Sequence, residues 1–528
     1  MKQLNNASNS SPGITRAMLL AGAMLAGGCT MIGPDFEVPE ADLPTQWNDR
    51  ATTVPGQQPA DYSQWWQVFQ DPVLNMLVET ARSQNLTLQI AGLRVLEARA
   101  QLGIVTGRLY PQSQTVSGNY SYNRGKETPL TDKYFSQAGT GFDVAWEMDF
   151  WGKFRRSLES ADASLLASVA GYDDVLVTLT AEVARNYILV RTLEERIRLA
   201  NENIAIQARS LELTTNQFET GSVTELDMQQ ATTQLRNTQA TVPALQISLD
   251  KARHALSILM GMPPQDLADM LGSGGEIPTA PAAVAAGIPA ELLRRRPDIR
   301  QAELQAAAQS AQVGVASAEL LPAFSLFGSF GWNVNNAGQD SLGDLFDSSN
   351  FSFSAGPAFN WKILNYGRLQ NQVRVQDARL EQLLTNYENT VLVAAGEVED
   401  SISGFINSRL EADFRRESAA AAERSSALSM LQYTEGVSLY QSVLDSNRSL
   451  AAQQDAYAQV RGNIAINLIA LYKALGGGWE TRSEIPFVPE QVQQKMRERT
   501  DWGKLLDISD EDVPALDPDT DRWPAPDW

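Results

Sequence analysis

The sequence predicts a mainly α-helical protein that also forms a membrane β-barrel, with duplicated long helical hairpins and two β-hairpins per protomer. Three features predict this fold: an internal duplication, long proline-free stretches with a heptad pattern, and short stretches in which polar and apolar residues alternate. With 528 residues the chain could hold several domains by length alone. The duplication instead predicts one composite body.

The duplication extends over most of the chain. Trp146–Gly261 aligns with Trp361–Gly476 at a constant shift of 215 residues, and Leu86–Pro111 aligns with Pro297–Pro322 at a shift of 211 residues. A repeat of about 200 residues is too long for a solenoid unit. We therefore expect one fold with two similar halves, whose function depends on what the halves form together.

The chain is acidic, with 63 Asp and Glu residues against 42 Lys and Arg residues and a net charge of −21. Nucleic acid is a poor partner for such a chain, because phosphate binding requires a basic face. A large acidic surface suits cation traffic, or simply solubility.

Residues 1–28 are predicted to be a signal peptide. Lys2 and Arg16 precede the apolar run Ala17–Ala26, which is too short to span a bilayer and is followed by small residues. Cys29 comes next and is the only cysteine of the chain, so it forms no intrachain disulfide.

The residues around Cys29 resemble a bacterial lipobox, which implies a lipoprotein signal peptide and a covalent lipid, such as palmitate, on Cys29. Ala26 departs from the usual pattern, which prefers Leu three places before the cysteine. Thr30 stands where Asp would mark retention at the inner membrane, so the resemblance implies sorting to the outer membrane. The alternative is an ordinary cleaved signal that leaves a free thiol.

Four short segments alternate between apolar and polar residues, as strands do. They are Thr115–Tyr122 and Phe142–Phe150 in the first half, and Phe324–Trp332 and Phe351–Trp361 in the second. Each half thus contributes one hairpin whose strands have the length and alternation of transmembrane β-strands. A half-buried hairpin of a soluble protein is the alternative.

Four strands are too few to close a barrel, and an open sheet edge cannot face lipid. Several copies must therefore combine, and three protomers related by symmetry would supply a trimeric 12-strand barrel. The chain has no apolar run of 18 or more residues beyond the signal, so a membrane crossing by this chain would have to be such a barrel.

Most of the remaining sequence is predicted to be helical. From about Ser157 to Gln217 there is no proline, and about 60 residues of helix would extend for roughly 90 Å. Returning helices are expected over about Leu226–Met260 and Val443–Leu475. A heptad seam is carried by Val169, Leu176, Val183, Val190, Ile197, Ile204 and Leu211, and in the second half by Leu384, Val391, Val398 and Phe405.

These features divide the chain into six segments. They are the signal peptide 1–28, an acylated N-terminal extended segment 29–85, a first structural repeat 86–261, a Pro/Gly/Ala linker 262–289, a second structural repeat 290–476 and an acidic C-terminal tail 477–528. The tail is expected to be non-periodic, and its final part suggests surface wrapping or disorder.

Several segments resemble the TolC-like outer-membrane efflux factors, in the acylated lipoprotein (NodT/OprM-like) branch of tripartite resistance-nodulation-division efflux systems. They are Ile32–Phe36, Leu43–Trp47, Trp65-Trp66 and, above all, Ile288–Glu303. The resemblance covers about residues 29–476. It implies a homotrimer in the outer membrane of a Gram-negative bacterium, with a twelve-stranded barrel continued by a twelve-helix α-barrel. It also implies a periplasmic adaptor and an inner-membrane proton-driven pump as partners.

The same resemblance implies a periplasmic gate at the tip of the second helical hairpin. Asp445 matches an acidic residue that forms a ring in relatives, and Arg448 would be its partner one helical turn later. Ser442 occupies a place where some relatives carry a second Asp, so this gate would be less acidic. An exposed ion pair of little energetic value is the alternative reading. The implied adaptor contacts are Gly221, Val223, Thr224, Gly436, Val437 and Ser438.

No catalytic constellation is visible in the sequence. His254 is the sole histidine, so a His or Cys metal site is not expected, and no phosphate-binding loop is present. We expect no enzymatic activity and no cofactor apart from the lipid on Cys29. The predicted function is a passive exit duct for drugs and small toxic compounds. A pore-less periplasm-spanning tether and the exit duct of a one-step protein secretion system are the alternatives.

Overall fold

The computed structural model describes residues 31–39, 62–126, 134–272, 274–281, 295–337, 341–484 and 486–506. The chain separates into two compact units, each built from three segments. Unit 1 comprises Met1–Pro39, Ala98–Leu165 and Leu304–Thr385, and unit 2 comprises Glu40–Glu97, Leu166–Glu303 and Asn386–Trp528. Both units therefore draw on both halves of the duplication.

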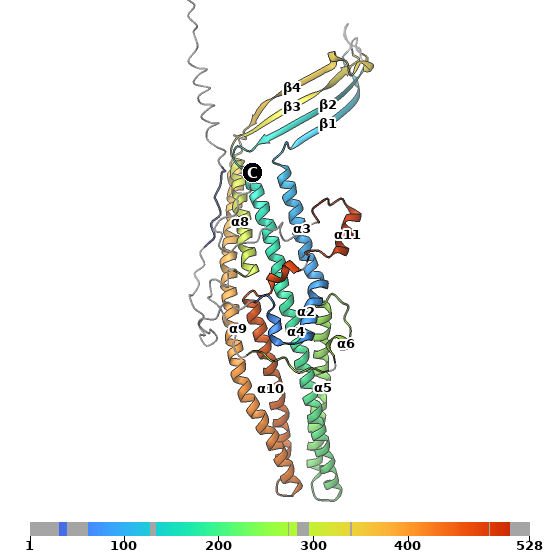
Figure 1. Ribbon diagram of the computed structural model, residues 1–528, viewed down its shortest axis with the longest axis vertical. Coiled ribbons are helices and arrows are strands. Elements are labelled where there is room, and N and C mark those ends of the chain that lie inside the picture. The colour runs from blue at the N-terminus through green and yellow to red at the C-terminus, as the bar shows by residue number, and fades with distance from the viewer. Residues whose placement is uncertain are drawn as a thin grey trace, which may run out of the picture. The chain divides into compact units, whose positions relative to one another are not determined.

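Unit 1 contains a four-stranded antiparallel sheet in the order β1-β2-β3-β4 (Figure 1). The strands are β1 (Ser113–Arg124), β2 (Tyr134–Met148), β3 (Ala323–Asn335) and β4 (Phe351–Asn360). Each half supplies one hairpin, and the hairpins join through β2 and β3. The four predicted strands are confirmed, because a period of two fixes strand and face together.

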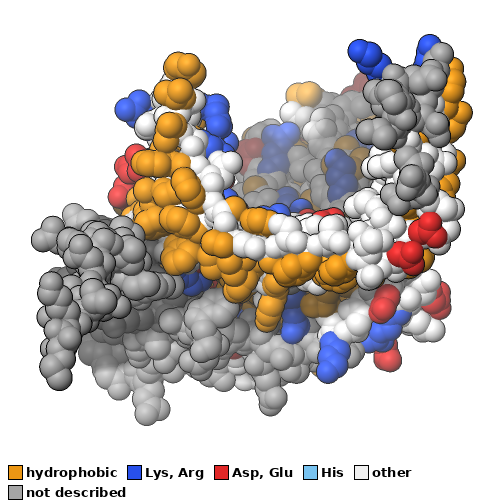
Figure 2. Space-filling view, turned by 90° about the horizontal axis from the view of Figure 1, so that it is seen from above, with side chains coloured by type: hydrophobic (Ala, Val, Ile, Leu, Met, Phe, Trp, Pro, Cys, Tyr) orange, Lys and Arg blue, Asp and Glu red, His pale blue; other side chains and the backbone are white. Residues whose placement is uncertain are grey.

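The two faces of this sheet differ in chemistry. One row across the four strands consists of Val116, Phe142, Phe330 and Phe353, and the next row consists of Ser117, Gly141, Gly331 and Ser352. In the first row Val116 is 80% exposed and Phe353 is 68% exposed. Figure 2 shows hydrophobic side chains gathered along the outer side of the curved band, with other side chains and backbone along its inner side. The sheet thus has one exposed apolar face and one face of small and polar residues.

The helices repeat in length between the halves. Helices α3 (Leu86–Gly107) and α8 (Pro297–Ala318) have 22 residues each, α4 (Lys153–Glu219) and α9 (Arg368–Thr434) have 67 each, and α5 (Glu225–Leu259) and α10 (Tyr440–Ala474) have 35 each. The two long helical hairpins, α4–α5 and α9–α10, are therefore confirmed (Figure 1). Helices α3, α4, α8 and α9 contain residues of both units.

Helix α4 begins earlier than its heptad pattern predicted. Gly152 has a left-handed φ of 75°, which lets the chain turn sharply after β2. The Asp149 carboxylate then accepts the backbone amides of Phe154 and Arg155 at 3.0 Å each. This acidic group at the N-terminus satisfies amides that lack an intrahelical partner.

The predicted heptad seam of α4 is confirmed only in its first part. Val169, Leu176, Val183 and Val190 are fully buried in unit 2, but Ile197, Ile204 and Leu211 are only partly buried. Beyond Leu193 the buried positions of α4 are the polar residues Asn203, Gln207, Ser210 and Thr214. A straight helix has 3.6 residues per turn and drifts away from a strict seven-residue repeat. The helix therefore presents a different stripe of residues near its end.

Shorter elements complete the described chain. They are η2 (Trp65–Phe69), α2 (Pro72–Gln84), α6 (Ala268–Leu271), η3 (Leu342–Asp344), η4 (Ser348–Asn350), η5 (Trp479–Glu484) and α11 (Glu490–Arg499). Helix α11 lies within the C-terminal tail, where no apolar period in the sequence indicated a helix. The helix exposes most of its side chains and buries only Met496, which is why no apolar period marks it.

Within the described ranges, no helix is both long enough and apolar enough to cross a membrane.

Candidate functional site at the hairpin tips

Each helical hairpin of unit 2 turns at a glycine with left-handed backbone. Gly221 has a φ of 74° and Gly436 has a φ of 72°. The next amide, of Ser222 or Val437, donates to the carbonyl five residues earlier at 2.8 Å and 2.9 Å. This Schellman arrangement ends α4 and α9 in the same way. The predicted equivalence of the two glycines is thus an equivalence of backbone geometry.

The helices that leave the two turns start differently. Thr224 caps α5, and its side chain and that of Asp227 form a reciprocal capping box. Leu439 occupies the corresponding place before α10 and supplies no side-chain cap. The second tip therefore lacks a local stabilisation that the first tip has, worth about 1 kcal/mol.

The six predicted adaptor-contact residues lie at these turns, and most of them face solvent. Gly221, Thr224, Gly436 and Val437 are exposed, and Val223 and Ser438 are half-buried. Two leucines add to this apolar surface: Leu439 is 79% exposed and Leu226 is 64% exposed, beside Val437 at 78%. Exposed apolar side chains in such density mark interaction surfaces.

The two tips contact each other through a small apolar cluster. Tyr433, Tyr440, Val443 and Leu444 of the second hairpin pack with Ala231 of α5, and Leu211, Leu213, Val223 and Met430 lie against this cluster. The rings of Tyr433 and Tyr440 meet edge to face at 5.4 Å. The Tyr440 hydroxyl lies 3.2 Å from Ser210 Oγ. Burial raises the pKa of both phenols, so both stay neutral at physiological pH.

Asp445 lies on the exposed side of α10, with 61% of its side chain accessible. Its carboxylate accepts two hydrogen bonds from Gln441 Nε2, at 3.1 Å and 3.0 Å. The Arg448 guanidinium is farther away, with Nη1 at 3.9 Å from Asp445 Oδ1. Gln441 is thus the closer partner of Asp445.

Arg448 has its own partner on another helix. Its Nε donates to Gln234 Oε1 of α5 at 2.8 Å, which links the two hairpins. Ser442 is exposed and lines a shallow groove of α9 and α10 with Ser425, Leu428 and other residues. The Gln441–Asp445 pair follows the i,i+4 rule and could have been read from the sequence. The bond to Gln234 could not, because it depends on how α5 and α10 pack.

Cys29 lies outside the described residues, but the segment that follows it is held in unit 1 by several bonds. The Ile32 amide donates to Trp151 O at 3.1 Å. The Arg156 side chain is almost fully buried and bonds Asp35 Oδ1 at 2.6 Å and Ile32 O at 3.3 Å. This segment is therefore fixed beside the end of β2.

The described residues contain no group of three or more His, Cys, Asp or Glu side chains arranged to hold a metal ion. The tips combine exposed apolar side chains, a carboxylate and glycine turns. That combination suits contact with another protein.

Comparisons with known proteins agree with this geometry. The chain matches the model described as "Outer membrane efflux protein" over residues 77–262 and 288–477. It is similar to Nodulation protein T of Rhizobium leguminosarum bv. viciae, with 31% identity over 86% of this chain and 92% of the relative. It is also similar to the Pyoverdine export outer membrane protein OpmQ of Pseudomonas putida, with 31% identity over 84% of this chain and 93% of the relative. The solved outer-membrane channel OprN has a TM-score of 0.78 and 32% identity, over 85% of this chain and 100% of its own.

Proposed function

We propose that this chain, which belongs to the outer membrane efflux protein family, acts as a passive exit duct formed by three copies. It is the outer-membrane channel component of a tripartite efflux pump. The family consists of transport ducts. The open sheet of unit 1 is the observation that best supports the proposed trimer.

Among the described residues no further strand pairs with β1 or β4, so the sheet has two open edges there, and it has an exposed apolar face. Unpaired backbone groups at a sheet edge cannot face lipid, because no water is there to bond them. Pairing β4 of one copy with β1 of the next removes every edge when the ring closes. Three copies would give twelve strands, with the apolar face toward lipid and the polar face toward a pore.

The hairpin tips would form the periplasmic mouth. Under threefold symmetry the three Asp445 carboxylates would approach one another and form an acidic ring, with Arg448 and Ser442 beside it. Like charges repel at short range, so this ring would favour cations and repel anions. The bond from Arg448 to Gln234 supports a role for Arg448 in holding the two hairpins together.

The exposed apolar residues of the tips support docking of a periplasmic adaptor, which would link the duct to an inner-membrane proton-driven pump. Val437 and Leu439 offer the larger patch, and Gly221, Val223, Thr224, Gly436 and Ser438 complete the contact surface. We propose no enzymatic activity for this chain, since passive transport needs none. Energy for transport would come from the pump.

A lipid on Cys29 would be the chain's only covalent addition, after removal of residues 1–28. The fixed segment from Ile32 to Asp35 supports this assignment, because it ties the residues after Cys29 to the end of β2. The remaining segments would be an extended stretch to residue 85, two repeats at 86–261 and 290–476, a linker at 262–289 and a tail at 477–528. The proposed cargo is drugs and small toxic compounds. OpmQ is named for pyoverdine export, which supports export as the role.

The mass of the detergent-extracted protein, from light scattering corrected for bound detergent, tests the proposal. A trimer of about 170 kDa is expected from the 57.8 kDa chain. A stable monomer would contradict the duct and favour a pore-less tether. Deleting the gene should then raise drug susceptibility. Loss of protein export in place of drug resistance would indicate a secretion duct.

A further inference from the structure

A cavity of about 240 Å³ lies in unit 1, where the strands meet the helices. Four of its five charged lining residues come from different places: Glu147 near the end of β2, Lys153 at the start of α4, Glu319 just after α8 and Lys362 just after β4. No motif in the sequence marks these residues. They are far apart in the chain, and only the joining of the two halves through β2 and β3 brings them together.

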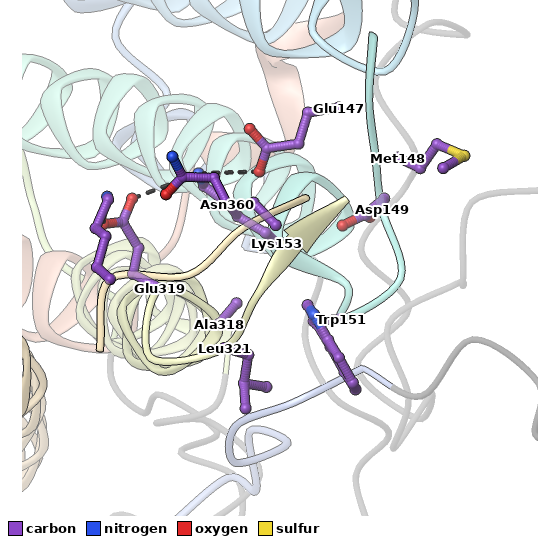
Figure 3. A pocket seen from close by; sticks show the side chains of 11 residues that line it. Glu147, Met148, Asp149, Trp151, Lys153, Ala318, Glu319, Leu321 and Asn360 are labelled. Carbon is purple, nitrogen blue, oxygen red and sulfur yellow. Dashed lines mark hydrogen bonds and ion pairs between the residues drawn. The ribbon is translucent and has the colours of Figure 1, made fainter. Parts of the chain in front are cut away.

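The four charges form one row in which basic and acidic groups alternate. Lys362 Nζ lies 3.3 Å from Glu319 Oε2, and Lys153 Nζ lies 3.4 Å from Glu319 Oε1 and 3.4 Å from Glu147 Oε1. Figure 3 shows Lys153 between the two glutamates, with Met148 pointing away from the row. Asp149 also lines the cavity, but it is already bound to Arg155 and to the start of α4.

The row lies on the polar side of the sheet. Glu147 pairs with Ser325, whereas the neighbouring Met148 pairs with Phe324, which in turn pairs with Phe359. Successive residues of a strand point to opposite faces. Glu147 therefore shares a face with the Ser117–Ser352 row, opposite the exposed aromatic side chains. In a closed barrel with lipid on its apolar face, this polar face lines the pore.

The lysines of this row can change partners at little cost. The Lys153 side chain is 30% exposed and that of Lys362 is 55% exposed, and their glutamate partners are about one-third exposed. Ion pairs this accessible contribute under about 1 kcal/mol, because water solvates both ions well. An anionic group that enters the cavity could thus replace Glu319 as a partner of Lys362 without disrupting the fold.

We propose that Lys153 and Lys362 form a contact site for the anionic group of a passing solute, with Glu147 and Glu319 as their resting partners. The inference rests on the proposed function and adds a cargo class, namely organic compounds that carry a carboxylate or another anionic group. A chain with a net charge of −21 repels such compounds elsewhere. The site offers them two ammonium groups where the duct enters the membrane.

Ion selectivity in planar bilayers tests this assignment. Lys362→Gln and Lys153→Gln are each combined with Asp445→Ala, so that the proposed gate does not mask the effect, and the reversal potential is measured in a KCl gradient. Each lysine variant should raise the permeability ratio of K⁺ to Cl⁻ by about twofold or more, and Glu319→Gln should lower it. Lys362→Arg, which keeps the charge, should match the parent.

The matched control is Arg124→Gln, which removes the same charge from another part of the sheet. Arg124 is the last residue of β1, lies on the face of the exposed aromatic residues and sits over the ring of Tyr134 at 5.8 Å. Its replacement should leave the reversal potential unchanged. An equal shift in Arg124→Gln and Lys362→Gln would mean that net charge alone acts, which overturns the site.

A chemical test locates the lysine directly. The natural chain has one cysteine, Cys29, so Lys362→Cys adds a single new thiol. An anionic methanethiosulfonate reagent should lower the conductance of Lys362→Cys and leave that of the parent unchanged. Channels that show neither this block nor a shift in reversal potential would overturn the inference but leave the duct intact. A wild-type trimer without conductance would overturn the duct itself.

Discussion

Asn85 and Arg296 occupy equivalent places in the two halves and bond the same carbonyl of the two returning helices. Asn85 Nδ2 donates to Leu259 O at 2.8 Å, and Arg296 Nη1 donates to Ala474 O at 2.9 Å. Both acceptors lie at the end of a helix, where carbonyls lack an intrahelical partner. The duplication has thus kept a capping bond while the side chain that makes it has changed.

Arg296 makes more bonds than Asn85 does. Its guanidinium also bonds both oxygens of Asp298, at 3.0 Å and 2.8 Å, and Glu397 Oε2 at 2.8 Å. It therefore joins α8, α9 and α10 within unit 2. In the first half, Glu182, which is equivalent to Glu397, bonds Arg185 on its own helix. The second half is consequently the more strongly cross-linked of the two at this level.

Arg296→Ala should lower the free energy of unfolding by about 2–4 kcal/mol, because hydrogen bonds to charged groups are lost and Ala474 O is left unpaired. Asn85→Ala should cost less, about 1–2 kcal/mol, because it removes the bond to Leu259 O and the bond that Asn85 Oδ1 accepts from the Leu88 amide at 2.9 Å. Arg198→Ala is the control: this arginine is 53% exposed and pairs with Glu195 and Glu202, so its loss should cost under about 1 kcal/mol. Thermal unfolding of the detergent-extracted protein ranks the three variants by their loss of stability. Equal losses in all three would contradict the prediction.

High pH should destabilise the protein through Tyr187. Burial, and then the bond from its hydroxyl to Asp71 Oδ2, raise the pKa of this phenol to about 12. A raised pKa means that the folded state holds the proton more tightly, so the stabilisation is complete below pH about 10 and is lost as pH rises toward 12. Tyr187→Phe removes this titration.

The measurement is the unfolding midpoint between pH 9 and 12. The wild-type midpoint should fall more steeply than that of Tyr187→Phe. Burial also raises the pKa of Tyr472 to about 12. Tyr472 therefore contributes a similar loss of stability in wild type and in Tyr187→Phe. Identical slopes in wild type and Tyr187→Phe would show that the phenol titrates normally.

The proposed gate gives a functional prediction. Asp445→Ala should raise basal conductance in planar bilayers, because alanine removes the bulk of the three carboxylates that would narrow the mouth, together with their contacts to Gln441 and Arg448. Asp413→Ala is a matched control: Asp413 is 64% exposed and lies 3.1 Å from Arg416 in the same i,i+3 spacing, but on α9. Unchanged conductance in Asp445→Ala, or an equal rise in both variants, would remove Asp445 from the gate.

Much of the fold follows from periodicity alone. The strands are predictable because apolar and polar residues alternate over a whole strand, and the helices because long proline-free stretches carry an apolar heptad pattern in both halves. Side-chain contacts between helices that are distant in the chain depend on packing and are not predictable in this way. In the buried polar stripe from Asn203 to Thr214, two side chains meet polar groups of α10: Asn203 Nδ2 donates to Gln454 Oε1 at 2.7 Å, and Ser210 Oγ lies 3.2 Å from the Tyr440 hydroxyl.

The candidate site shows the same division. The glycine turns and the Gln441–Asp445 pair are local, so the sequence contains them. The bond between Arg448 and Gln234 and the charged row around Lys153 join segments that are distant in the chain. No local pattern distinguishes such residues from ordinary exposed charges.

The turn at Gly436 should tolerate no side chain without strain. Its left-handed φ of 72° costs a residue with a Cβ about 1–2 kcal/mol, although nothing lies within 4 Å of the added atom. Gly436→Ala should therefore lower the unfolding midpoint. Gly396→Ala is the control, because Gly396 lies inside α9 with equally open space and should become more stable by up to about 1 kcal/mol.

The exposed apolar surface of the second tip gives the sharpest test of partner binding. Leu439→Asp should abolish drug resistance in a deletion strain while the protein remains a trimer, because a charge at a docking surface must be desolvated when the adaptor binds. Leu226→Asp places the same charge on the first tip and tells whether both tips contact the adaptor. Leu439 is 79% exposed and supplies no side-chain cap to α10, and Asp is a favourable residue at this N-cap position, so the replacement should not weaken folding. Full resistance in both variants, with normal trimer mass, would exclude the tips as the docking surface.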